Sequence, residues 1–561
     1  MGLRDRIRKN KKAVLITAGI LLAIFLFFLV FVDRLVEPIL RNRLHTLIIK
    51  GSDSLYTYQL GNLKANFFGG NVEVENLQIR IDSSRYHELH RKNALPALTM
   101  QLTLDKGQFR GISVVALLFG KKVRIQEILS RAADLKISRH VQLERDQQFD
   151  KPLWKSIQPD IEGIYVERIK LDGIKLLYRN ADTSESVKLQ FDRCDALFED
   201  IAIDSTAAAD TNRIGFTRDI LMKFHDLKFR TQDSTYKMKA EWITYSSRDK
   251  SFEVDSFKLQ PTLEKDSFYK AFPVQQSLYY IEFVKARFHN LHLDRFLHSN
   301  MIEADSIFFV RPQIEVYNDK SMPPAFVSKV GKYPHQKLLK ANEGIHIGKI
   351  GFTHGDIEYR EKNEKTTKEG RIFFNDLSFE ATNVTNITSV IKKNPVCKAS
   401  VTGNILGAGR LNVDFRFFLD SLEGQYEASG WVKNLGAAQL NPLAIPLANA
   451  QINSFNIKEL NFFVRGEDFE ARSDVRMLYN SLSVTLRKTD DETGQTSVKK
   501  FITKILNKFV LYPDNPGADG VERTASDSRV LRLTSQSFFA LFWKSIFAGM
   551  QDIMMKSGRY S

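Results

Sequence analysis

Apolar and polar residues alternate along most of the chain, a period of two that is typical of β-strands with one buried face. In the segment LNVDFRF, residues 411–417, the apolar positions are Leu411, Val413, Phe415 and Phe417. In the segment at 72–81, Val72 and Val74 are followed by Leu77, Ile79 and Ile81 in the opposite phase. The change of phase predicts a β-bulge near Asn76.

The number of such segments predicts a large sheet. The dipeptide Asp172-Gly173 separates two alternating segments and predicts a hairpin turn. Strands and turns of about 12–15 residues would fill residues 51–495, and a sheet of that size has to curl, split or close. We therefore expect a mainly β protein: a long, curled antiparallel β-groove whose apolar faces meet one another or a ligand.

Two parts of the alternating region repeat. Residues 162–179 read EGIYVERIKLDGIKLLYR, and residues 343–360, which follow 181 residues later, read EGIHIGKIGFTHGDIEYR. The apolar positions Val123, Ile128, Leu135 and Ile137 recur 179 residues later as Ile302, Ile307, Ile314 and Val316. Two matches at nearly the same spacing predict a duplicated unit of about 180 residues.

An uncharged apolar run at residues 13–32, AVLITAGILLAIFLFFLVFV, precedes this region. Twenty helical residues span about 30 Å, the thickness of a bilayer's hydrocarbon layer, so the run predicts a transmembrane helix. A cleaved signal peptide is the alternative, but that needs a shorter run and a small-residue cleavage site. Six Lys and Arg lie in residues 1–12, whereas Asp33 and Glu37 follow the run. This asymmetry predicts a cytoplasmic basic tail at 1–12, and residues 33–50 continue at helical spacing as a connecting helix.

The C-terminal residues 496–561 change back to helical spacing. Residues 497–510 predict a basic amphipathic helix, residues 512–530 a linker, and residues 537–556 an apolar, aromatic helix. The basic helix has two interpretations: it caps the β-region with its apolar face, or it docks on an anionic membrane surface. The second interpretation gives these membrane-surface candidates: Lys499, Lys500, Phe501, Lys504, Ile505, Lys508 and Phe509.

Net charge and cysteine count limit the classes of partner and of scaffold. The net charge of +15 suits anionic partners, such as lipid head groups, or is simply an excess of solvated Lys and Arg. With only two cysteines, Cys194 and Cys397, a disulfide-built scaffold is excluded, and we expect two separate buried thiols.

Catalytic and metal-binding patterns are missing from the sequence. No GxSxG, HExxH, Walker or DxDxDG motif occurs. His289 and His292, three residues apart, would lie on opposite faces of a strand, which disfavours a metal site. We therefore expect no enzyme activity, no cofactor, no metal and no nucleic-acid partner.

The two ends resemble a known family. The segment at 58–63, YQLGNL, leads into GNVEVENLQI at 70–79, and LNPL at 440–443 precedes INSF at 452–455 and MLYNSL at 477–482. These segments resemble AsmA-like proteins of bacterial envelopes, whose β-grooves are related to bridge-like lipid transfer proteins. The resemblance implies a first groove unit or units at 51–310, and a second unit with an AsmA-like C-terminal module at 311–495. It supplies no catalytic residues.

The function expected from these features is lipid binding or conduction between membranes. The chain would be anchored in the bacterial inner membrane with its body in the periplasm. Its partners would be phospholipid or another envelope lipid, the inner membrane, and an outer-membrane or periplasmic protein. The lipid-groove candidates are Val72, Val74, Leu411, Val413, Phe415 and Phe417. A non-catalytic scaffold for outer-membrane assembly is the alternative, because a groove lining and a protein core have the same alternation.

Overall fold

The computed structural model describes most of residues 52–556. The described residues are 38, 41–42, 44–45, 48–49, 52–66, 69–92, 94–96, 98–112, 122–140, 162–180, 188–210, 212–214, 216–231, 233–325, 327–364, 368–489, 496–499, 503–504 and 506–556. The protein is mainly β, as the alternation predicts: 59% of the described residues lie in strands and 17% in helices. The chain forms two compact units, residues 1–232 with 243–248, and residues 233–242 with 249–561.

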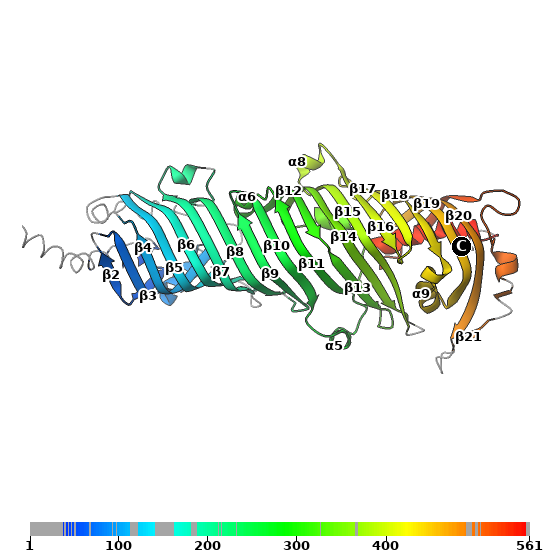
Figure 1. The fold of residues 1–561 in the computed structure, drawn as a ribbon, viewed down its shortest axis with the longest axis horizontal. Helices are drawn as coiled ribbons and strands as arrows, with labels where there is room; N and C mark the ends of the chain where they lie inside the picture. Colours follow the sequence, from blue (N-terminus) through cyan, green and yellow to red (C-terminus); the bar gives the residue numbers. More distant parts are fainter. Residues whose placement is uncertain are drawn as a thin grey trace, which may run out of the picture. The chain divides into compact units, whose positions relative to one another are not determined.

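The first unit is built on strands that follow one another along the chain (Figure 1). They are β1 (Tyr56–Leu60), β2 (Leu63–Asn66), β3 (Asn71–Ile81), β4 (Leu98–Arg110), β5 (Lys122–Arg139), β6 (Gly163–Asn180), β7 (Lys188–Ile203) and β8 (Thr217–Arg230). β1 and β2 both pair with β3, and each later strand pairs with the one before it. The short helices α2 (Ser83–Arg91) and η2 (Ala207–Ala209) lie in connections. Strand β9 (Tyr236–Ser246) contains the boundary between the two units.

The second unit is also built mainly of strands. Its strands are β10 (Ser251–Pro261), β11 (Leu278–His289), β12 (Met301–Val310), β13 (Gln313–Asp319), β14 (Gly344–Lys362), β15 (Glu369–Thr385), β16 (Val396–Ile405), β17 (Gly409–Phe418), β18 (Tyr426–Gly436), β19 (Ala450–Gly466), β20 (Glu470–Thr489), β21 (Thr496–Val498) and β22 (Thr524–Leu531). Its helices are α5 (Lys265–Ala271), α6 (Leu293–Ser299), α7 (Pro334–Leu339), α8 (Thr388–Ile391), α9 (Ala437–Ala448), η3 (Leu506–Val510) and α11 (Phe538–Met554).

The predicted duplication is confirmed at the level of strand pairing. β5 runs parallel to β6, and the broken strand β12–β13 runs parallel to β14. Ile128 lies opposite Ile169, and the matching residues Ile307 and Ile350 lie opposite each other. These parallel pairs correct the expectation of an antiparallel sheet. A parallel partner needs a long return connection, which residues 320–343 with α7 provide in the second unit.

Each repeated strand pair is kinked at the same place. Ala132 and Gly173 are neighbours in left-handed conformation, with φ of 52° and 68°, and their equivalents Arg311 and His354 have φ of 49° and 54°. Asn76 is left-handed, with φ 55°, at the place where the sequence changes phase, but the β3–β4 register is unbroken across it, so the predicted β-bulge is wrong. A left-handed residue breaks the alternation of faces, so apolar side chains stay on one face although the sequence changes phase. Val74 and Leu77 accordingly belong to the same buried cluster.

The kink at Gly173 corrects the predicted hairpin. β6 runs through Asp172-Gly173 as one strand of 18 residues, and the backbone N–H of Gly173 donates to Asp195 Oδ1 at 2.8 Å. The duplicated position keeps a similar contact, His354 Nδ1 to Asp376 Oδ1 at 2.6 Å. Glycine tolerates the left-handed conformation in a bulge as well as in a turn, so the dipeptide alone did not distinguish the two.

The predicted transmembrane run 13–32 lies outside the described residues, and no helix among the described residues is long and apolar enough to cross a membrane. The predicted helix at 537–556 is confirmed as α11, whose N-cap Ser537 accepts a hydrogen bond from the Ala540 N–H. The predicted linker at 512–530 is wrong at its end, because residues 524–531 form β22 and pair with β20.

Candidate functional site

The second unit carries a lane of phenylalanines on the apolar face of β10–β15. The Phe257 and Phe283 rings stack at 4.8 Å, and Phe283 meets the edge of Phe309 at 5.3 Å. Phe309 lies opposite Phe352 across the parallel pair, and Phe352 stacks on Phe379 at 5.3 Å. All five side chains are half-buried. We call these five residues, Phe257, Phe283, Phe309, Phe352 and Phe379, the phenylalanine lane.

A second apolar row runs beside the lane. Cross-strand pairing joins its members in the order Leu259, Ile281, Ile314, Ile357 and Phe374. These side chains are also half-buried, so the sheet presents two adjacent apolar rows over five strands. Rows of partly exposed apolar side chains form an apolar surface, and covering that surface with hydrocarbon lowers the free energy.

The lane continues into the C-terminal part of the unit. Phe379 pairs with Val401, which pairs with Val413, and Val413 lies opposite Gly430. Gly430 in turn lies opposite Phe462, whose ring is 5.9 Å from that of Phe542 in α11. The sequence-predicted candidate Val413 is therefore in register with the lane.

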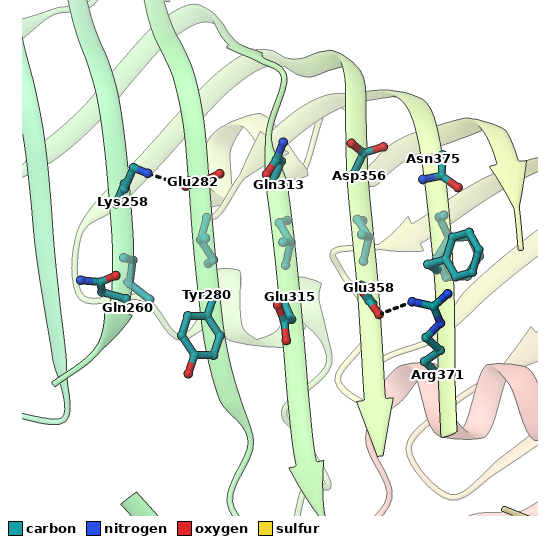
Figure 2. A pocket seen from close by; sticks show the side chains of 16 residues that line it. Lys258, Gln260, Tyr280, Glu282, Gln313, Glu315, Asp356, Glu358, Arg371 and Asn375 are labelled. Carbon is teal, nitrogen blue, oxygen red and sulfur yellow. Dashed lines mark ion pairs between the residues drawn. The ribbon is translucent and has the colours of Figure 1, made fainter. Parts of the chain in front are cut away.

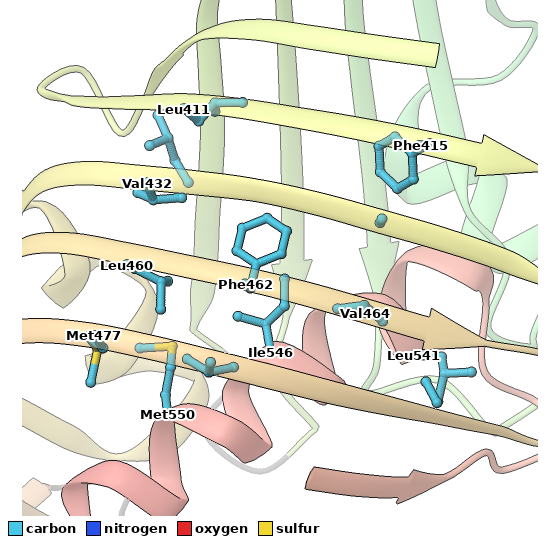
Figure 3. Close-up of a cluster of buried hydrophobic side chains, with 14 of the residues drawn as sticks. Leu411, Phe415, Val432, Leu460, Phe462, Val464, Met477, Leu541, Ile546 and Met550 are labelled. Carbon is cyan, nitrogen blue, oxygen red and sulfur yellow. The ribbon is translucent and has the colours of Figure 1, made fainter. Parts of the chain in front are cut away.

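Helix α11 covers the apolar face from β17 onward. Figure 3 shows the side chains of Leu411, Phe415, Phe462 and Met477 together with those of Ile546 and Met550 from the helix. The Phe415 ring lies 5.3 Å from Phe542, and Phe417 lies 5.7 Å from Phe538. Leu411, Phe415 and Phe417 are thus buried against protein, and the structure places them under a helix rather than on an open face.

Small residues allow the close approach of α11. A Cβ on Gly549 would come within 2.3 Å of a Val475 methyl carbon, so only glycine fits there. The Ser473 hydroxyl donates to the carbonyl oxygen of Ser545 at 2.6 Å, and both side chains are buried. This fit between β20 and α11 is that of a packed core.

Helix α9 crosses the other end of these strands. It packs on β15, β18 and β19. A Cβ on Gly370 of β15 would come within 2.6 Å of Leu447, and the Asn441 side chain bonds both the N–H and the carbonyl oxygen of Ile452. The two prolines inside α9, Pro442 and Pro446, do not prevent this docking.

Val72 and Val74, the candidates in the first unit, are buried. They pack with Leu63, Leu77 and Leu104 on the apolar face of β2–β4.

Cys194 belongs to the buried cluster of Val72 and Val74, and burial raises the pKa of its thiol to about 12. Cys397, in the second unit, is also a free buried thiol, as predicted. Both thiols are therefore protonated and unreactive at neutral pH.

The opposite face of β10–β15 is polar. A hollow of about 580 Å³ crosses β10, β11, β13, β14 and β15. Its lining contains two rows of polar residues and, between them, the residues of the second apolar row (Figure 2). Lys258 pairs with Glu282 at 3.0 Å, and Arg371 pairs with Glu358 at 3.7 Å. Neighbouring charges compensate one another, as on an ordinary solvated surface.

The basic segment at 497–510, predicted as a helix, begins with strand residues. Ser497 and Val498 lie in β21, which pairs with Arg487 and Lys488 of β20, so the predicted helix start is wrong. The side chains of Thr503 and Asn507 hydrogen-bond to backbone groups of β20. These bonds anchor the segment to the sheet, as its interpretation as a cap requires.

The membrane-surface candidates lie in or near this segment. Lys499 and Lys504 are exposed. Lys500, Phe501 and Ile505 lie outside the described residues. Lys508 and Phe509 lie in η3, where the structure describes the backbone.

Among the described residues, no group of three or more His, Cys, Asp or Glu is arranged to hold a metal ion. The buried His335 packs on Phe417 at 5.0 Å between ring centroids, and burial lowers its pKa to about 4. It is therefore neutral at physiological pH and belongs to the core.

Comparison with known proteins identifies no family for this chain. No family model and no curated protein matches this sequence.

Proposed function

We propose that this chain is a membrane-anchored envelope protein that holds lipid acyl chains on the apolar face of its sheet and passes them between membranes. The observation that carries the proposal is the phenylalanine lane, five half-buried rings over β10–β15 beside a second apolar row. Each methylene group removed from water contributes about 0.8 kcal/mol. The resemblance to AsmA-like proteins supports the same proposal, as does the apolar run at residues 13–32.

Photo-crosslinking tests the lane directly. With p-benzoylphenylalanine at Phe309 of the full-length protein, we expect a covalent lipid adduct, detected by mass spectrometry after purification from cells. The adjacent Phe308 is the matched control, because it opposes Arg287 and Gly351 and points to the other face of the same strand. Equal adducts at both positions, or an active crosslinker at Phe309 that captures no lipid, would overturn the proposal.

A non-catalytic scaffold is the second candidate, favoured by the packing of α11 over β17–β20. A face filled by its own helix needs no lipid. This function predicts that a crosslinker at Phe309 captures protein and no lipid. The same experiment therefore separates the two functions.

The proposed location gives a further prediction. Because basic residues precede the apolar run, a phosphatase that folds only outside the cytoplasm should be active when fused after residue 50. A fluorescent protein that matures only in the cytoplasm, fused at the same position, is the control and should remain dark. A bright fluorescent fusion with an inactive phosphatase would reverse the orientation.

A further inference from the structure

One end of the second unit exposes apolar side chains from four separate segments. The end is formed by the β17–β18 turn, the β19–β20 turn, the loop at 327–331 and the chain at 531–539. Six large apolar side chains there are between 56% and 97% exposed: Val327, Leu422, Phe469, Leu531, Leu533 and Phe539. We call these six residues the tip.

Backbone hydrogen bonds hold the four segments together. The N–H of Arg532 donates to the Phe469 carbonyl oxygen at 2.8 Å, and that of Lys329 donates to Thr534 at 2.7 Å. The N–H of Asp468 donates to the carbonyl oxygen of Glu423, next to Leu422, at 2.9 Å. The exposed side chains are therefore presented by a fixed framework.

A buried ion pair fixes the same framework. The Arg532 guanidinium donates to Asp468 Oδ1 at 3.1 Å and to the carbonyl oxygens of Lys329 and Gln536. Both charged side chains are buried, at 1% and 8% exposure. The guanidinium also lies 4.4 Å from the centre of the Tyr333 ring.

Positive charge gathers beside the apolar tip. Lys329, Lys332 and Lys337 are exposed on one segment. The acidic residues here are largely engaged: Asp468 with Arg532, and Glu470 with Arg472 and Arg529. Asp420 and Glu423 are exposed and flank Leu422, and Glu467 in the β19–β20 turn is half-buried.

We infer that the tip docks on a bilayer containing anionic phospholipid. Single apolar side chains at turn ends, with Leu422 97% exposed, suit insertion among lipid chains better than a flat protein interface. The lysines beside them match the charge of anionic head groups. This docking does not depend on lipid binding in the phenylalanine lane.

Fluorescence of a labelled tip tests the inference. The two native cysteines are buried, so a Leu422→Cys variant of the full chain, held in zwitterionic nanodiscs, takes the polarity-sensitive dye NBD at one position. Vesicles with one quarter phosphatidylglycerol should shift its emission to the blue and raise its intensity at least twofold. Pure phosphatidylcholine vesicles should do so less. The control label at Val521, exposed in a loop outside the tip, should not respond.

Variants make the result decisive. Phe469→Asn with Leu533→Asn should remove the response, and Lys329→Glu with Lys332→Glu should remove the preference for anionic vesicles. No response to either vesicle by the folded protein would overturn the inference. A blue shift that depends on protein concentration and needs no vesicles would identify a second copy as the occupant and overturn it as well. Phe309→Asp should leave the response intact, so failure of the lane and failure of the tip are distinguishable.

Discussion

Replacing Phe415 with aspartate should unfold the C-terminal part of the second unit. The ring is buried among the rings of Phe417, Phe538 and Phe542. The substitution removes a core aromatic side chain and places a charge in its site, and each change alone costs several kcal/mol. We expect a loss of more than about 4 kcal/mol in the free energy of unfolding.

Hydrogen exchange is the appropriate measurement, because the chain has two units and need not unfold in one step. Amides of α11 and β20 should lose protection in the Phe415→Asp variant, while those of β3–β6 in the first unit act as an internal reference. Asp414→Ala is the matched control, since Asp414 lies on the opposite face of β17 and is exposed. If α11 keeps its protection in the Phe415 variant, then its packing on β17 does not stabilise this part of the unit.

The alternation of apolar and polar residues predicts the fold class and several elements, because a sheet with one apolar face requires that alternation. The phase change at Asn76, the strand at 411–417 and the terminal helix are each local patterns. The repeat in the sequence predicts that β5–β6 and β12–β14 are equivalent. The parallel direction of those pairs could not be predicted, since alternation is the same in both directions.

The strands are longer than the sequence predicts, and the C-terminal connection contains an unpredicted strand, both for physical reasons. Left-handed residues such as Gly173 and His354 resemble turns in sequence but continue the strand, so strands reach 18 to 20 residues. The composition of residues 524–531 predicts a linker and not β22, because polar residues surround the buried Ala525 and Ser528, which face β20 and α11.

The candidate site was only partly accessible from sequence. Val413 lies in register with the phenylalanine lane, but the lane itself was missed, although its signal is present. Phe257, Phe283, Phe309, Phe352 and Phe379 each occupy an apolar position of an alternating strand. Their alignment depends on strand register and on the kinks between them. Nor could alternation show that α11 covers Phe415 while the lane stays half-exposed, because a core and a groove lining share one pattern.

Replacing Asp468 with leucine should destabilise the tip and the start of α11 together. The carboxylate accepts hydrogen bonds from the Gly331 N–H at 3.0 Å and the Gln336 amide at 2.7 Å, besides its ion pair with Arg532. Without it, Arg532 keeps only carbonyl partners in a buried site. Removing one partner of a buried ion pair costs about 3–5 kcal/mol, so protection should fall in residues 329–337, 467–470 and 532–541.

A double-mutant cycle separates the charge from the shape of the site. Arg532→Met combined with Asp468→Leu removes both charges, and the pair should lose less stability than the sum of the single variants, because no buried charge remains unpaired. Arg416→Ala, which breaks the exposed pair with Glu427 at 2.9 Å, is the control and should change stability by at most about 1 kcal/mol. If Asp468→Leu costs no more than this control, the four segments of the tip are held by their backbone hydrogen bonds alone. A strong effect would instead make the ion pair the element that fixes the tip, and the Asp468 variant should then also lose the vesicle response of the NBD label at residue 422.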